Sequence, residues 1–294
     1  MGKLKSDHMK AILVAIVASI SFGALALNPS RTYKQRPEKY NMEYKEVKVK
    51  TNDGAAELNT WYFPAKKKTT ALVLIAHNGE GNMADYLRRI DQFRSAYNVV
   101  IFDYRGFGES SEFEIDHNMY IYPHFQDDME TMIDHCRKQY VGTFDIYGWG
   151  IGAGLGLGVG HSRPEVKRII ADTPFLSMED LEERFESWDE PMEVPFAGYE
   201  QRHEPAQISD ENLGKNIEKI QIIVGSNDLL FKSDDYKKLI GSSKKFNGIH
   251  VIENPDQKDN YKVDKTSYFK LISSVFTIPA ETTNEVESVQ SERN

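Results

Sequence analysis

The stretch Phe144-Asp145-Ile146-Tyr147-Gly148-Trp149-Gly150-Ile151-Gly152-Ala153-Gly154 decides the fold of this 294-residue chain. Its first half is largely apolar and predicts a buried strand, and the small residues of its second half predict a helix that packs closely on a sheet. Between them, Gly148-Trp149-Gly150 predicts a sharp turn, because glycine adopts backbone conformations that other residues avoid. The stretch therefore predicts a strand, a tight turn at Gly150 and a helix.

The same strand-helix unit recurs along the chain. A hairpin over residues 44–63 precedes it, with Asn52-Asp53-Gly54 at its turn. Continuous apolar runs predict buried strands over 71–76, 98–104, 144–148, 166–171, 217–224 and 248–252, and helical spacing predicts helices over 83–97, 122–140, 151–160, 233–240 and 268–276. This alternation predicts an α/β fold: a mostly parallel sheet with an N-terminal antiparallel hairpin and helices on both faces.

Ligands of such sheets bind at the carboxyl ends of the strands. The residues that follow five predicted strands are His77, Gly150, Asp172, Asp228 and Asn254. We therefore expect these five loops to share one edge of the sheet.

Composition excludes several classes of protein. The net charge of −9 argues against nucleic acid as a partner, because phosphate backbones require a basic face. The single cysteine, Cys136, excludes an internal disulfide, and no Cys/His cluster has the spacing of a metal site. We predict neither a bound metal nor a cofactor.

The N-terminal segment has the features of a targeting sequence. Three lysines precede an apolar run over residues 11–27 that ends in Ala24-Leu25-Ala26, an A-x-A cleavage pattern. We predict a signal peptide over residues 1–27 and a secreted or periplasmic protein. The alternative is an uncleaved membrane anchor over residues 11–27, which is about as long as the shortest spanning helices.

The remaining chain divides by composition. Residues 28–42 are a polar lead-in, residues 43–278 form the α/β domain, and residues 279–294 are a polar, disordered tail. Within the domain, residues 178–216 have weak periodicity and many acidic residues, and we predict a small lid insertion there.

Four stretches of the domain resemble the alpha/beta-hydrolase superfamily. The run 74–79 (LIAHNG) is similar to its oxyanion loop, 102–110 (FDYRGFGES) to its F-D-x-R-G-x-G-x-S run, 147–152 (YGWGIG) to its nucleophile elbow, and 224–228 (VGSND) to the loop of its triad acid. The chain looks most like the serine-aminopeptidase-like and esterase-like branch. The resemblance implies an alpha/beta-hydrolase fold over roughly residues 43–277.

Two of the three triad positions depart from the family pattern. The resemblance places the nucleophile serine at Gly150, which has no attacking group, and the acid at Asp228, which is retained. The histidine should follow the last strand, but residues 254–261 (NPDQKDNY) contain none, and His250 should lie within the strand. Without a nucleophile to present, glycine relieves the backbone strain of the elbow.

We therefore expect a catalytically inactive pseudo-hydrolase that retains a ligand-binding cleft for a small molecule, peptide or protein. The candidate binding residues are His77, Asn78, Gly79, Trp149 and Ile151, and the amides of Gly79 and Ile151 are candidates for an anion-binding nest. The alternative is an active esterase-type or peptidase-type hydrolase with a rebuilt, non-serine centre. In that alternative His117, His124 or His203 would supply the base.

Overall fold

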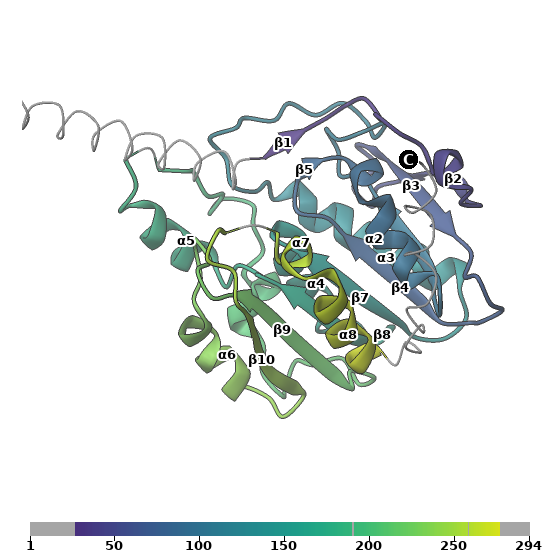
Figure 1. Ribbon diagram of the computed structural model, residues 1–294. Helices are drawn as coiled ribbons and strands as arrows, with labels where there is room; N and C mark the ends of the chain where they lie inside the picture. Colours follow the sequence, from purple (N-terminus) through teal and green to yellow (C-terminus); the bar gives the residue numbers. More distant parts are fainter. Residues whose placement is uncertain (1–26, 190, 258, 277–294) are drawn as a thin grey trace, which may run out of the picture.

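One eight-stranded sheet organises the computed structural model, which describes residues 27–189, 191–257 and 259–276 (Figure 1). Its strand order is β10-β9-β8-β7-β4-β6-β3-β2. The strands are β2 (Lys45–Lys50), β3 (Glu57–Phe63), β4 (Leu72–Ala76), β6 (Asn98–Phe102), β7 (Phe144–Trp149), β8 (Val166–Asp172), β9 (Lys219–Gly225) and β10 (Phe246–Ile252). The six strands from β10 to β6 run parallel, and β3 and β2 add an antiparallel edge. The predicted mostly parallel sheet with an N-terminal hairpin is confirmed.

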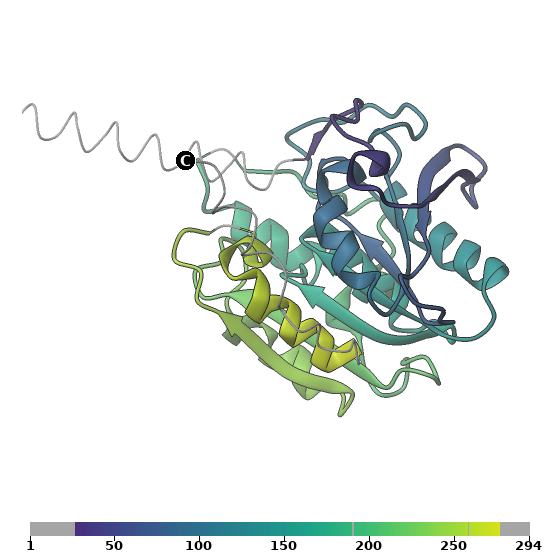
Figure 2. The same cartoon turned by 45° about the vertical axis from the view of Figure 1, so that its right-hand side comes forward.

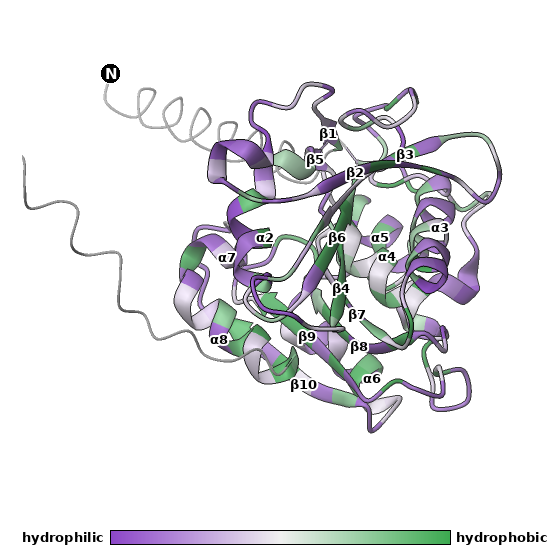
Figure 3. Ribbon diagram, turned by 90° about the vertical axis from the view of Figure 1, so that its right-hand side faces the viewer, coloured by the Kyte–Doolittle hydropathy of each residue, from purple (hydrophilic) through white to green (hydrophobic). Residues whose placement is uncertain are grey.

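The central strands are buried on both faces, as their unbroken apolar sequences predict. Alternate residues of β4 enter two different cores: Leu72, Leu74 and Ala76 belong to one, and Val73 and Ile75 to the other. Figure 3 shows hydrophobic residues concentrated in the central strands and mostly polar residues in the surrounding loops. Burial on both sides explains why these strands show no apolar-polar alternation.

Two layers of helices cover the sheet (Figure 2). Side chains of α3 (His124–Gln139), α4 (Ile151–Gly160) and α6 (Lys237–Gly241) pack into the core that contains Leu74. Those of α2 (Leu87–Phe93) and α8 (Lys265–Phe276) pack into the core that contains Ile75. The predicted helix over 83–97 is divided into the 3₁₀ turn η2 (Met83–Tyr86) and α2. Two further short helices are η5 (Ser233–Tyr236) and α7 (Asn260–Val263).

The lead-in is tied to the loops at the carboxyl edge of the sheet. Its first residues form β1 (Asn28–Pro29), which pairs in parallel with β5 (Glu80–Gly81), and η1 (Pro37–Tyr40) follows. The Tyr33 hydroxyl donates to Asp103 Oδ2 at 2.5 Å. The lead-in is thus an ordered part of the domain, which the polar composition of residues 28–42 does not reveal.

Most of the predicted targeting segment lies outside the described residues, as do Lys258 and the tail from residue 277. The signal peptide, its anchor alternative and the disordered tail therefore remain predictions. Leu27, the last residue of the predicted segment, is described, and its side chain is buried. Within the described part of the chain, no helix is long and apolar enough to cross a membrane.

The insertion between β8 and β9 contains α5 (Met178–Phe185) and the 3₁₀ turns η3 (Gln201–His203) and η4 (Pro205–Gln207). It packs against α4: a Cβ atom on Gly158 would stand 1.8 Å from the carbonyl oxygen of His203. The insertion therefore lies along the helix that follows the elbow.

The backbone of α4 lies so close to β4 that glycine is required at the contact. A Cβ atom on Gly152 would stand 2.3 Å from the carbonyl oxygen of Ala76 and 2.5 Å from that of His77. Both are backbone atoms of the sheet, so they cannot rotate away.

We expect Gly152→Ala to lower the free energy of unfolding by about 3 kcal/mol or more, the upper end of the range for overpacked cores. Urea unfolding measures this loss. The matched control is Gly241→Ala, because, apart from its chain neighbours and the backbone of its own helix, no heavy atom of the described residues lies within 4 Å of the added methyl group. The control should change stability by no more than about 1 kcal/mol, and equal effects of the two substitutions would contradict the packing argument.

Candidate functional site

The carboxyl-end loops converge on one cavity of about 250 Å³ beside Gly150. Four of the five loops predicted to share an edge contribute Gly150, Asp172, Asp228 and Asn254, and the fifth contributes Asn78, which follows His77. Trp149, Ile151, Tyr120 and Asp259 complete much of the wall. No described residue of the insertion at 178–216 lines this cavity, which we call the elbow cleft.

Gly150 has the backbone conformation of a nucleophile elbow. Its φ of 57° and ψ of −130° are accessible to glycine and strained for other residues. Its N–H donates to the carbonyl of Asp172 at 2.9 Å, and its own carbonyl accepts from Ala153 at 3.0 Å in the first turn of α4. The turn predicted from the sequence is therefore present without the side chain that it usually presents.

Asn78 fills the space that a side chain at residue 150 would need. A Cβ atom on Gly150 would stand 2.8 Å from Asn78 Cβ and 3.4 Å from Asn78 Cα. Asn78 is held there, because its Oδ1 accepts from the Tyr86 hydroxyl at 2.7 Å. The sequence placed Asn78 in the binding loop but contained no indication that it would cover the elbow.

The loop that resembles the oxyanion loop, residues 74–79, is held by hydrogen bonds and apolar contacts. The Gly79 N–H, a predicted member of an open anion-binding nest, donates to His77 Nδ1 at 3.2 Å. The buried His77 ring also places its Nε2 3.5 Å from Asp103 Oδ1. A Cβ atom on Gly79 would stand 2.7 Å from Leu27 Cδ2 and 2.8 Å from Ile151 Cδ1, so apolar groups pack on the loop. The Gly79 amide, a candidate for the anion-binding nest, is thus already engaged by the imidazole of His77.

Asp228, where the resemblance places the triad acid, is hydrogen-bonded to backbone groups of its own loop. Its Oδ1 accepts from the backbone N–H groups of Leu230 and Phe231, both at 3.0 Å. Burial raises the pKa of its carboxyl, and these two hydrogen bonds oppose the shift. The carboxylate therefore caps the turn after β9.

Two asparagines occupy the region where the resemblance places the histidine. Asn254 follows β10, is buried, and donates from Nδ2 to Asn260 Oδ1 at 2.8 Å. Asn260 in turn donates from its Nδ2 to Asp172 Oδ1 at 2.7 Å. No described residue that lines the elbow cleft is a histidine. These two side-chain amides link the carboxyl ends of β8 and β10, in the region where the resemblance places the histidine.

Asp172 is the central acceptor of this network. Asp172 Oδ2 accepts from the Tyr268 hydroxyl at 2.6 Å, in addition to the bond from Asn260 to Oδ1. The hydroxyl oxygens of Tyr268 and Tyr147 lie 2.9 Å apart. Burial raises the pKa of the Asp172 carboxyl to about 7, while the hydrogen bonds from Tyr268 and Asn260 act in the opposite direction. The sequence suggested only a turn or a cap for Asp172, because Asn260 and Tyr268 are about ninety residues away.

Arg89 pins the loop after β10 to α2. Its buried guanidinium lies 4.2 Å from the ring centroids of both Trp149 and Tyr261. It also forms an ion pair with Asp259. Trp149, a candidate binding residue, is therefore a wall of the cleft and a packing partner of Arg89. Arg89 was missed, since adjacent Arg88 and Arg89 cannot be told apart by sequence pattern.

The histidines proposed for a rebuilt centre lie elsewhere. His117 Nδ1 lies 2.6 Å from the Leu27 carbonyl oxygen, and His124 and His203 line a separate cavity between α3 and the insertion. His250 lies within β10, as predicted. The three proposed bases are therefore not at Gly150. Across the described ranges, no cluster of three or more His, Cys, Asp or Glu side chains could hold a metal ion.

Comparisons with known proteins agree with this geometry. The family model described as serine aminopeptidase, S33, matches residues 67–265. An esterase of Pyrococcus furiosus is 18% identical over 86% of this chain and 97% of its own, with a TM-score of 0.64. The Penicillium alpha/beta hydrolase GrgF is 13% identical over 80% and 98%, with a TM-score of 0.59. A serine hydrolase without lid from Xanthomonas campestris is 15% identical over 82% and 97%, with a TM-score of 0.53. A search of curated protein sequences finds no match.

Asp172→Asn is expected to change how stability depends on pH. In the unfolded chain the carboxyl loses its proton near pH 3.8, whereas in the folded protein it keeps the proton up to about pH 7. The wild type should therefore lose stability relative to the variant as the pH rises from 4 to 7, by up to about 4 kcal/mol. Urea unfolding at several pH values measures the difference.

The control is Asp210→Asn, which removes an exposed carboxyl. Its stability should follow the wild-type pH profile. Parallel profiles for the wild type and Asp172→Asn would mean that Asp172 does not retain its proton in the folded protein.

Proposed function

Since the chain belongs to the serine aminopeptidase S33 family of alpha/beta hydrolases, we propose that it is an inactive member that has kept the elbow cleft for binding. The family supplies the fold and the place of the site, whereas the inactivity is inferred from the residues at that place. We propose the elbow cleft as the site of recognition.

The contact between Gly150 and Asn78 carries the proposal. Acyl transfer in this fold requires a nucleophile on the elbow with free space in front of it. Here the elbow has no side chain, and the atoms of Asn78 lie where one would project. Both the attacking group and its space are missing.

The other two triad roles support the same conclusion. A serine hydrolase needs an imidazole to take the proton and a carboxylate to orient the imidazole. The amides of Asn254 and Asn260 bond to each other and to Asp172, and the Asp228 carboxylate caps a turn. A carboxamide is too weak an acid and too weak a base to act as a proton carrier at neutral pH, so this arrangement favours a rigid site over a proton relay.

The elbow cleft itself favours a small occupant. Its volume of about 250 Å³ lies just below the range of typical ligand pockets, roughly 300–1,000 Å³. Of the occupants considered, a small molecule or one inserted side chain of a peptide or protein suits this size. Asp172, Asp228 and Asn254 in the wall supply the polar groups that would orient it.

One observation favours the alternative of a rebuilt hydrolase. The Asp172 carboxyl lines the cleft, and its pKa of about 7 is the value that suits a general acid or base at neutral pH. Its two oxygens already accept from Asn260 and Tyr268, which favours the structural role. Activity measurements separate the two.

The purified protein should not hydrolyse p-nitrophenyl esters or aminoacyl nitroanilides, because no described residue at the elbow supplies an attacking group on residue 150 or an imidazole. A fluorophosphonate probe should not label it. An active esterase assayed alongside shows that the substrates and probe are competent. Turnover at about 1 s⁻¹ or faster, the low end of ordinary enzymes, would contradict the proposal.

Restoring serine should not restore activity. We expect Gly150→Ser to lose stability, because serine is strained at φ 57° by roughly 1–3 kcal/mol and meets Asn78 Cβ. The double variant Gly150→Ser/Asn78→Gly removes the contact but not the strain. Unfolding of wild type, both single variants and the double variant gives the coupling between the two sites.

A favourable coupling of at least about 0.5 kcal/mol is expected for residues in contact. Additive effects would show that Asn78 does not exclude the serine. Efficient ester hydrolysis by Gly150→Ser alone would show that the missing histidine does not matter.

A further inference from the structure

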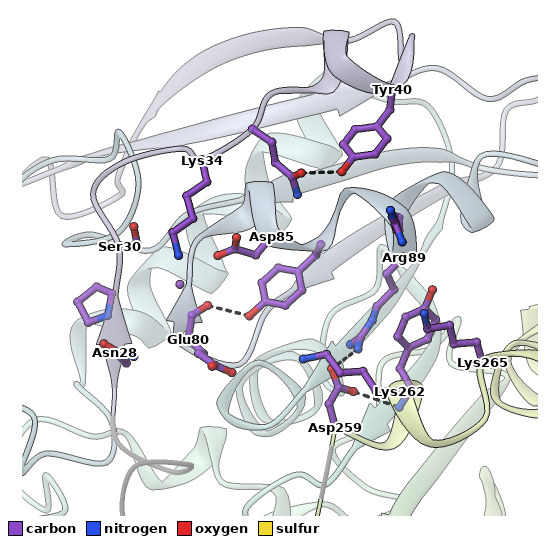
Figure 4. A pocket seen from close by; sticks show the side chains of 16 residues that line it. Asn28, Ser30, Lys34, Tyr40, Glu80, Asp85, Arg89, Asp259, Lys262 and Lys265 are labelled. Atoms are coloured by element: carbon purple, nitrogen blue, oxygen red, sulfur yellow. Dashed lines mark hydrogen bonds and ion pairs between the residues drawn. The ribbon is translucent and has the colours of Figure 1, made fainter.

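A second cavity, of about 690 Å³, lies beside the elbow cleft and shares Glu80, Asp259 and Lys262 with it (Figure 4). Three separate segments form its walls: the lead-in from Asn28 to Tyr40, the β5–α2 region, and the region of α7 and α8. Its volume is within the range of small-molecule sites. We call it the lead-in cavity.

Cationic side chains from all three segments line the lead-in cavity. Lys34 belongs to the lead-in, Arg88 to α2, and Lys262 and Lys265 to α7 and α8. Figure 4 shows Lys34 on one side of the cavity, with Lys262 and Lys265 on the other. All four residues are exposed, and none forms an ion pair with a described carboxylate.

The acidic residues of the cavity do not balance these cations. Asp259 is already paired with the buried Arg89. Asp85 accepts from the Asn82 N–H at 3.3 Å in the cap of η2. Glu80 is the third acidic lining residue. Four unpaired cations therefore face two carboxylates outside that ion pair, in a chain whose net charge is −9.

The base of the lead-in cavity is rigid. Arg89 is held between Trp149 and Tyr261, and the Tyr86 hydroxyl oxygen lies 2.7 Å from both Asn78 Oδ1 and the Glu80 carbonyl oxygen, which share its one proton. A fixed base with exposed cations around it suits a compact anion, because lysine acts as a point charge that can reach phosphate oxygens from several directions. A planar carboxylate would engage fewer of these groups at once.

We propose that the lead-in cavity binds a small phosphorylated molecule, with Lys34, Arg88, Lys262 and Lys265 contacting its phosphate. A bound phosphate lowers the electrostatic repulsion among these cations, because its negative charge attracts each of them. The lead-in cavity is distinct from the elbow cleft, and phosphate binding there does not depend on whether the protein hydrolyses esters. A free metabolite and a phospholipid headgroup share this chemistry, and two arms of one experiment separate them.

The test compares the full-length wild type with the variant Lys34→Gln/Arg88→Gln/Lys262→Gln/Lys265→Gln. Calorimetry measures binding of glucose 6-phosphate, with glucose as the uncharged comparator. Sedimentation with phosphatidic acid vesicles, against phosphatidylcholine vesicles, measures binding to a headgroup. The control Lys67→Gln/Lys68→Gln/Lys238→Gln/Lys244→Gln removes four exposed, unpaired lysines that do not line the cavity.

We expect the cavity variant to bind one of the two phosphate probes about tenfold more weakly than the wild type, or weaker still, while the control variant changes little. The probe affected identifies the source of the phosphate. Equal affinities of cavity and control variants for both probes, or no wild-type binding of either at millimolar concentration, would overturn the proposal. Thermal melts of both variants check that their folds are intact.

Discussion

The close approach of β4, β7 and α4 is the constraint on which the rest of the structure depends. Gly148 and Gly152 have no room for a Cβ atom, because backbone atoms of the neighbouring segments stand less than 2.7 Å from where it would lie. Gly150 then turns the chain from strand to helix with a positive φ. This contact holds the elbow at the carboxyl edge of the sheet, so the loops after β4, β8, β9 and β10 can only meet around residue 150.

Several polar groups around the elbow pair with one another, which accords with the inactive protein that we propose. Asn78 covers Gly150, His77 accepts the Gly79 amide, and Asn254 and Asn260 pass a hydrogen-bond chain to Asp172. Buried polar groups are costly when unpaired, so these pairings stabilise the walls of the cleft.

The charged groups around the two neighbouring cavities differ in burial. In the wall of the elbow cleft, Asp172 is buried and bonded to a tyrosine and an amide, and Asp259 is paired with the buried Arg89. In the lead-in cavity, every lining cation except Arg89 is exposed and forms no ion pair with a described carboxylate. Arg89 connects the two cavities, because it contacts Tyr261 in the segment after β10 and also lines the lead-in cavity. The lead-in itself, tied down by β1 and Tyr33, completes that cavity.

The sequence by itself determined the sheet, its helices, the family and the tight turn at Gly150, because apolar periodicity, short motifs and glycine placement are local properties of the chain. It also identified Asp228 and the absence of histidine after β10. Only the tertiary structure decided that Asn78 blocks residue 150, that Asp172 meets Asn260 and Tyr268, and that Leu27 and Lys34 return to the carboxyl edge. These contacts join residues far apart in the chain, and their side-chain geometry depends on packing that no local pattern encodes.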